Sequence, residues 1–462
     1  MIRRTCTWIA HATGGRLHGT AADRTLLVKG VSTDTRNLWE NCLFVPLSGE
    51  RFDGHAFLNQ AVEGGAAAAL WQEDRPLPDA DIPLILVKDP LTALQRLASA
   101  WRLELGIPVV AVTGSNGKTT TKDLIAAVLS VRYRVHKTSG NFNNHIGVPL
   151  TLLSMPEDTE IAVVEMGMNH AGEISVLSKM ASPDAAVITN IGESHIEFLG
   201  SREGIAKAKL EVREGLSSNA PIVFDGDEPL LERLLEGETR PLIRVGWAGR
   251  SEESPVEPEM KGFEGFEFRS LRTGHRFRLP LLGRHNLKNA LMAVEIGRHF
   301  GMKDEEISRG LESVKLTGMR LEPVRARNGL TIVNDAYNAS PTSVKAALDL
   351  LAELEPGKEK WALLGDILEI GKDEEAYHRE LAGYAIRRGV IRLYTYGRRG
   401  KWIHEEALAL NRDPERVIRH FDTHEEAVRV LGEEGSSKAL LLVKASRAAR
   451  LDLVVHNLTE GA

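Results

Sequence analysis

The stretch Val109-Val-Ala-Val-Thr-Gly-Ser-Asn-Gly-Lys-Thr-Thr-Thr-Lys-Asp123 decides the fold of this 462-residue chain. Four apolar residues of the kind that favours strands lead into a glycine loop, and apolar side chains between Leu124 and Leu129 then recur at helical spacing. Gly114 and Gly117 let the loop turn its N–H groups around a phosphate, and the start of the helix adds the positive end of its dipole. The stretch therefore predicts a strand, a phosphate-binding loop and a helix.

The loop is a shortened form of the usual nucleotide motif, because Val112 stands where a further glycine is expected. Taken alone, such a short string also fits a glycine turn with a surface lysine. Its position between a strand and a helix favours a nucleoside triphosphate site. In that site Lys118 would meet the outer phosphates, and the Thr119 hydroxyl would hold Mg²⁺.

Size, composition and charge set the class of the protein. The length suits about three domains, each able to bury its own core. A formal net charge of −6 gives no reason to expect nucleic acid or an anionic membrane as a partner. Cys6 and Cys42 have no metal-ligand spacing, and no apolar run approaches the ~20 residues of a membrane span. We therefore expect a cytoplasmic protein without membrane insertion.

The order of strands and helices divides the chain into three α/β units. Residues 1–88 are typical of a small mixed α/β domain, and residues 89–317 combine the glycine loop with short buried strands, which predicts a parallel sheet. Residues 318–462 alternate apolar runs with amphipathic helices and predict a second doubly wound sheet. Within 89–317, residues 250–260 lack periodicity and predict a solvated loop, whereas 266–269 and 275–279 alternate and predict an antiparallel pair of strands.

Polar residues follow the predicted strands of the central unit. Glu165, Thr189 and His195 lie at or just after strand ends, and the carboxyl ends of parallel strands form the ligand crevice of such sheets. Glu165 is a plausible Mg²⁺ ligand, although a capping or surface glutamate is the commoner case, and a lone histidine is more often structural. Lys207 and Lys209 are two positions apart on a predicted helix, so at most one of them faces the crevice.

Seven strings spread over all three units resemble the Mur ligases. The resemblance implies a three-domain architecture with a small mixed α/β N-terminal domain, a central P-loop NTPase-like domain with a parallel sheet, and a C-terminal Rossmann-like domain. The strings are Thr113-Gly-Ser-Asn-Gly-Lys-Thr119, Asn141-Phe-Asn-Asn-His-Ile-Gly-Val-Pro149, Glu165-Met-Gly167, Thr189-Asn-Ile-Gly-Glu-Ser-His195, Ala206-Lys-Ala-Lys-Leu-Glu211, Asn334-Asp-Ala-Tyr-Asn-Ala-Ser-Pro341 and Leu364-Gly-Asp366.

The resemblance implies an ATP-driven amide ligase that uses Mg²⁺. Within the family, the Asn-Phe-Asn-Asn string at 141–144 and the Asp-Ala-Tyr-Asn string at 335–338 point to a member that joins D-alanyl-D-alanine to UDP-N-acetylmuramoyl-tripeptide. We expect such an enzyme to be a monomer. Two alternatives stay open: a related amide ligase such as a folylpolyglutamate synthase, and a nucleotide-dependent switch without ligase activity.

The resemblance also implies roles for single residues. Lys118, Lys209, His195 and Arg320 would be catalytic, and Lys209 would correspond to the lysine that CO₂ carboxylates in this family. Thr119, Glu165, His195 and Lys209 would form the metal sites. Contacts to the nucleotide would come from Gly114, Ser115, Asn116, Gly117, Lys118, Thr119, Thr120, Asn289, Arg320, Asp335, Tyr337 and Asn338. Contacts to the substrate would come from Ser32, Asp34, Arg36, Asp53, His55, Asn141, Asn143 and Asn144.

Two positions depart from the family pattern. Met319 stands within Thr317-Gly-Met-Arg320 where several relatives read Gly-Arg, and Ala445 stands where glycine is usual. These departures leave open where Arg320 and the loop at Ser446 lie.

Overall fold

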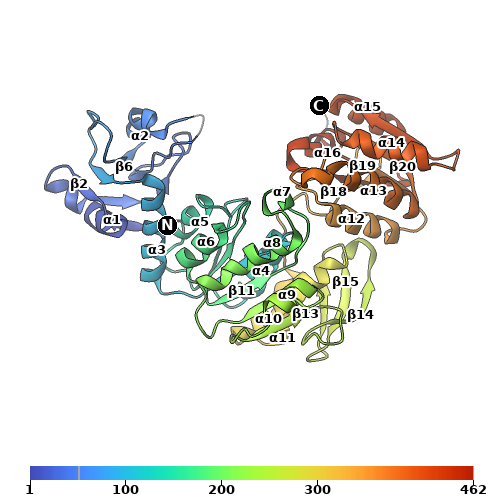
Figure 1. Ribbon diagram of the computed structural model, residues 1–462, viewed down its shortest axis with the longest axis horizontal. Coiled ribbons are helices and arrows are strands. Elements are labelled where there is room, and N and C mark those ends of the chain that lie inside the picture. The colour runs from blue at the N-terminus through green and yellow to red at the C-terminus, as the bar shows by residue number, and fades with distance from the viewer. Residues whose placement is uncertain (50–51, 461–462) are drawn as a thin grey trace.

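The structure is a computed structural model that describes residues 1–49 and 52–460. Figure 1 shows three α/β units in a row, with the N-terminal and C-terminal units at opposite ends of the central unit. Residues 50–51 of the first predicted domain and 461–462 of the third lie outside the described residues. Within the described part of the chain, no helix is long and apolar enough to cross a membrane.

The first unit is built on a sheet of five strands in the order β2-β7-β6-β5-β4. Its buried residues are continuous with one face of the central sheet through α3, so the two units share a core. The strands are β2 (Arg16–His18), β4 (Val31–Ser32), β5 (Cys42–Phe44), β6 (Ala66–Gln72) and β7 (Leu84–Val87), with a separate pair of β1 (Arg3–Thr5) and β3 (Leu27–Lys29). The helices are α1 (Cys6–Thr13), α2 (Leu58–Glu63) and α3 (Pro90–Leu105).

The central unit holds a parallel sheet of six strands in the order β13-β12-β11-β8-β10-β9. Alternate residues of β8 point to opposite faces, so Val109 and Ala111 pack toward α3 and α6 while Val110 and Val112 pack toward α4 and α10. The strands are β8 (Val109–Thr113), β9 (Val135–Lys137), β10 (Ile161–Glu165), β11 (Ala185–Ile188), β12 (Ile222–Asp225) and β13 (Leu242–Val245). The helices are α4 (Lys118–Leu129), α5 (Gly147–Leu153), α6 (Glu173–Ala181), α7 (Ile196–Leu199), α8 (Arg202–Leu210), α9 (Pro229–Leu234), α10 (His285–His299) and α11 (Asp304–Glu312).

A small antiparallel sheet flanks the central unit. The predicted pair of strands is confirmed as β15 (Phe266–Ser270) and β16 (Arg276–Leu279). The predicted solvated loop at 250–260 is wrong, because β14 (Pro255–Met260) pairs with β15 along this edge. The register shifts between Val256 and Glu259, where Glu257 has a φ of 48°, and this break hides the alternation expected of a strand.

The third unit is a second sheet of six strands in the order β17-β18-β22-β19-β20-β21, parallel except for the β17–β18 pair. This arrangement confirms the second doubly wound sheet predicted from the alternating runs. The strands are β17 (Glu322–Arg325), β18 (Thr331–Asp335), β19 (Glu359–Leu364), β20 (Val390–Tyr396), β21 (Val417–Phe421) and β22 (Ala439–Lys444). The helices are α12 (Pro341–Glu353), α13 (Glu374–Arg387), α14 (Gly400–Leu410), α15 (His424–Glu434) and α16 (Leu451–Thr459).

Candidate active site

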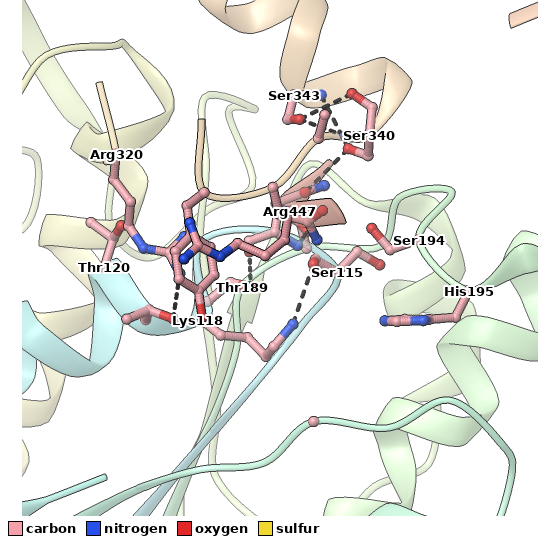
Figure 2. Close-up of a pocket in the computed structure, with 18 of the residues that line it drawn as sticks. Ser115, Lys118, Thr120, Thr189, Ser194, His195, Arg320, Ser340, Ser343 and Arg447 are labelled. Atoms are coloured by element: carbon pink, nitrogen blue, oxygen red, sulfur yellow. Dashed lines mark hydrogen bonds between the residues drawn. The ribbon is translucent and has the colours of Figure 1, made fainter. Parts of the chain in front are cut away.

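A cavity of about 800 Å³ lies where the central and third units meet. Figure 2 shows side chains from both units turned toward the glycine loop at its floor. The carboxyl ends of strands from both sheets contribute to the walls, as expected for parallel sheets. The lining includes Ser115, Asn116, Gly117, Lys118, Thr119, Thr120, Asn141, Asn143, Asn144, Glu165, His195, Asn289, Arg320, Asp335, Tyr337 and Asn338.

The glycine loop is held rigidly against the end of β11. Gly114 has a φ of 144°, and a Cβ atom there would lie 1.8 Å from Oγ1 of Thr189, so a side chain is excluded. The Thr189 hydroxyl donates to the Asn116 carbonyl at 2.6 Å, and the Asn116 N–H donates to Oδ1 of Asn190 at 2.9 Å. Gly117, with a φ of 80°, is the N-cap residue that precedes α4. The loop conformation is therefore set before any ligand binds.

Lys118 is bent back onto the loop. Its ammonium donates to the carbonyl oxygens of Gly114 at 2.8 Å and Ser115 at 3.3 Å. Desolvation lowers the pKa of Lys118, with Glu165 opposing and Arg320 adding to this effect. A phosphate oxygen that replaced these carbonyls would find a cation already in place.

Arg320 reaches across from the third unit to the first turn of α4. One terminal nitrogen donates to Oγ1 of Thr119 at 2.8 Å, and the guanidinium carbon lies 4.2 Å from the centre of the Tyr337 ring. The buried Nε has no hydrogen-bond partner among the described residues. Met319 has a φ of 62° and turns the chain just before Arg320. The departure at Met319 therefore leaves Arg320 at the glycine loop, where it can bind an anion.

Glu165 is buried in the cavity wall with 2% of its surface exposed. Oε1 accepts from the Asn143 amide at 2.8 Å, whereas the buried Oε2 finds no hydrogen-bond partner in the described part of the chain. Oε2 lies 3.9 Å from the Lys122 ammonium. A surface or capping role for Glu165 is excluded by this burial, and an oxygen is left for a cation.

His195 faces the third unit. Its backbone has a φ of 65°, and its Nδ1 lies 2.7 Å from Oε2 of Glu369. The imidazole lowers the pKa of Glu369. Figure 2 shows the His195 ring on the opposite side of the cavity from Arg320. Its metal role stays a prediction.

The two lysines of α8 have different surroundings, as their spacing predicts. Lys207 has 63% of its side chain exposed and pairs with Glu203 at 2.9 Å. Lys209 has 1% of its surface exposed and does not itself line the cavity. Burial, with a further contribution from Lys118, lowers the pKa of Lys209 well below its usual range. A buried amine that loses its proton readily is suited to react with CO₂.

Sequence reasoning missed several residues of the cavity wall. Lys444, at the end of β22, donates to Asp335 and to the Asn338 carbonyl at 3.1 Å, and so organises the third-unit side of the cavity. Asn190 follows β11 by two residues and holds the glycine loop. Both follow the rule that polar residues gather at carboxyl ends of strands. Glu369 lies in a loop after β19 and carries no such signal.

The predicted substrate residues separate into two groups. Asn141, Asn143 and Asn144 line the cavity, but the structure does not bring the first-unit residues to it. Within the first unit, Arg36 pairs with Asp34 at 2.7 Å, and Nδ1 of His55 lies 2.8 Å from Asp53. The Ser32 hydroxyl donates to the Asp34 carbonyl just after β4, and the Asp53–His55 pair lies at the start of the short 3₁₀ helix at 54–57.

Comparison with known proteins places these features in a family. Family models match residues 27–102 (Mur ligase family, catalytic domain), 112–297 (Mur ligase middle domain) and 319–447 (Mur ligase, glutamate ligase domain). UDP-N-acetylmuramoyl-tripeptide--D-alanyl-D-alanine ligase of Bacillus subtilis is 48% identical over 460 residues, which cover 100% of this chain and 99% of that protein. The chain belongs to the Mur ligase family.

Solved structures of Mur ligases have the same architecture. MurF from Acinetobacter baumannii is 29% identical, with a TM-score of 0.89 over 99% of each chain. MurF from Thermotoga maritima in complex with ADP is 28% identical, with a TM-score of 0.83 over 94% of this chain and 98% of that one. The predicted three-domain Mur ligase architecture is confirmed.

Proposed function

We propose that this protein is an ATP-dependent amide ligase of peptidoglycan precursor synthesis. It joins D-alanyl-D-alanine to the terminal carboxylate of UDP-N-acetylmuramoyl-tripeptide. The full-length similarity to the Bacillus subtilis ligase supports these substrates. The observation that carries the chemistry is the meeting of Lys118 and Arg320, from different units, at one glycine loop.

The arrangement suits phosphoryl transfer, which needs positioning and neutralisation of charge more than covalent help from the protein. The tripeptide carboxylate attacks the terminal phosphorus of ATP, and ADP leaves with the electrons of the broken P–O bond. The amine of D-alanyl-D-alanine then attacks the acyl carbon, loses a proton and displaces phosphate. Lys118 and Arg320 bind the phosphate oxygens whose charge develops during the first step.

Mg²⁺ fits the oxygen donors of the cavity. The free Oε2 of Glu165 and the Thr119 hydroxyl would hold one ion, and Mg²⁺ commonly takes only one or two protein ligands beside phosphate and water. Bound there, it would neutralise charge on the transferred phosphate. His195 and a carboxylated Lys209 are proposed for a second ion. In the described residues, no group of three or more His, Cys, Asp or Glu side chains has the geometry of a metal site.

The remaining ligand parts are assigned to the two sides of the cavity and to the first unit. Asn289, whose amide lies against Gly117 at the start of α4, would contact adenine, a role that the family resemblance implies. Asp335, Tyr337 and Asn338 would bind the nucleotide from the third unit. In the first unit, Ser32, Asp34, Arg36, Asp53 and His55 would receive the UDP end of the long substrate. In the cavity, Asn141, Asn143 and Asn144 would lie along its peptide.

The test is release of phosphate in mixtures that lack one component at a time. We expect turnover only when ATP, Mg²⁺, UDP-N-acetylmuramoyl-tripeptide and D-alanyl-D-alanine are all present. Versions of the tripeptide with meso-diaminopimelate or L-lysine would define its third residue. Equal turnover on a glutamate-extended folate would favour the folylpolyglutamate synthase alternative, and ATP turnover without either substrate would favour a switch.

A further inference from the structure

Lys122 and Asp123 form a buried charged pair on α4 that the proposed chemistry does not use. Each has 1% of its surface exposed, and the Lys122 ammonium lies 3.5 Å from Oδ1 of Asp123. That ammonium also donates to the Thr138 carbonyl at 2.9 Å, and Oδ1 of Asp123 accepts from Lys137 at 2.6 Å. Lysine and aspartate side chains are almost never fully buried unless they are paired, because desolvation opposes the charged forms.

The second oxygen of Asp123 is occupied by the segment that connects the central and third units. Oδ2 accepts from both the backbone N–H and the hydroxyl of Thr317, each at 3.0 Å. Thr317 follows α11 and comes before β17, the first strand of the third unit. A carboxylate with two hydrogen bonds from one residue fixes the start of this connection to α4.

The same connection touches α4 a second time, one turn earlier. Arg320, three residues after Thr317, donates to Thr119, and Thr119 and Asp123 are four positions apart on one face of the helix. The connection is therefore bound to α4 at two points, Asp123 and Thr119. Thr119 lies in the first turn of α4, next to the proposed phosphate site.

We propose that Asp123 is a positioning residue, which fixes Thr317 so that the Arg320 guanidinium is held at the outermost phosphate. The proposal rests on the proposed function in one respect: it takes that phosphate to be the terminal phosphate of ATP. The positive charge of Lys122 helps to keep Asp123 ionised inside the protein, and the same ammonium lies 3.9 Å from Oε2 of Glu165 in the cavity wall.

Thr317→Val tests the link with little change of shape. It removes the hydroxyl that donates to Asp123 and leaves the buried pair intact, so the folding risk of changing Asp123 is avoided. We expect the affinity for β,γ-imido-ATP to fall about tenfold, as a hydrogen bond to a charged group implies. The affinity for ADP, which lacks the outermost phosphate, should stay within about twofold under the same Mg²⁺ concentration. Thr317→Ser should restore binding.

Two controls separate positioning from general stability. Ser313→Ala removes a nearby hydroxyl whose one hydrogen bond among the described residues goes to the Gly310 carbonyl of α11, and we expect the variant to bind both nucleotides like wild type. In an Arg320→Ala background, Thr317→Val should cause no further loss for β,γ-imido-ATP, because the residue through which it acts is gone.

The proposal is overturned if Thr317→Val weakens ADP as much as β,γ-imido-ATP, if it weakens neither, or if its effect persists without Arg320. The readout is equilibrium nucleotide binding, so it decides the matter even if the wild-type protein ligates other substrates than those proposed.

Discussion

Gly114 is a position where one added methyl group should cost both stability and nucleotide binding. In Gly114→Ala, the new Cβ would lie 1.8 Å from Oγ1 of Thr189 and 3.0 Å from its backbone nitrogen. The hydroxyl can rotate away, but it then loses its bond to the Asn116 carbonyl. That loss is about 1 kcal/mol, and a non-glycine residue at positive φ adds about 1–3 kcal/mol. We expect the free energy of unfolding to fall by about 2–4 kcal/mol.

The assay is urea unfolding of Gly114→Ala beside Gly106→Ala. Gly106 has a φ of 63°, and no atom of the described residues lies within 4 Å of the position of its Cβ, so Gly106→Ala carries a cost of positive φ without the clash. Binding of ADP should be lost in Gly114→Ala and unchanged in Gly106→Ala. Adding Thr189→Ala to Gly114→Ala should recover part of the stability. Equal unfolding free energies for the two glycine variants would refute the reasoning.

Three further predictions concern the lysines. Lys118→Ala should lower the rate of phosphate release by about 100-fold or more, while thermal unfolding stays near that of wild type, because its ammonium stabilises transferred charge rather than the fold; a wild-type rate would contradict this. Lys209→Ala should abolish ligation and recover partly with added acetate, whereas Lys207→Ala, exposed and paired with Glu203, should stay active; full activity of Lys209→Ala would disprove the carboxylated lysine. CO₂ reacts with the neutral amine of Lys209, and acidification through the lowered pKa of Lys209 should protonate that amine. Bicarbonate should therefore restore the activity of a CO₂-depleted enzyme at neutral pH and fail to restore it in acid.

Strands in the sheet interiors were predictable because burial on both faces leaves a continuous apolar run. β8 and β10 match the predicted apolar runs, because both faces of these strands are buried and no position has to be polar to face water. β14 was not predictable, because an edge strand with prolines and a bulge has the composition of a loop. The pairing that makes it a strand is supplied by β15.

The candidate site was predictable as far as it follows from the carboxyl ends of strands. That rule brings Glu165, Thr189 and His195 to the cavity that holds Lys118. The rule does not predict the contact between Arg320 and Thr119, because the packing of the third unit on the central one depends on a connecting segment without periodicity. Only the family resemblance gave Arg320 a role. The burial of Lys209 also depends on tertiary packing, which spacing along a helix cannot specify.

The two walls of the cavity belong to separate sheets, and this division has a consequence for inhibitors. A compound that contacts only the glycine loop can leave through the open side without moving the third unit. A compound that also engages Arg320 and Lys444 is held by both walls, so its departure requires the units to part. The residence time of a compound should therefore depend more on whether it contacts both units than on how much surface it buries. Screening by dissociation rate should separate the two types of compound.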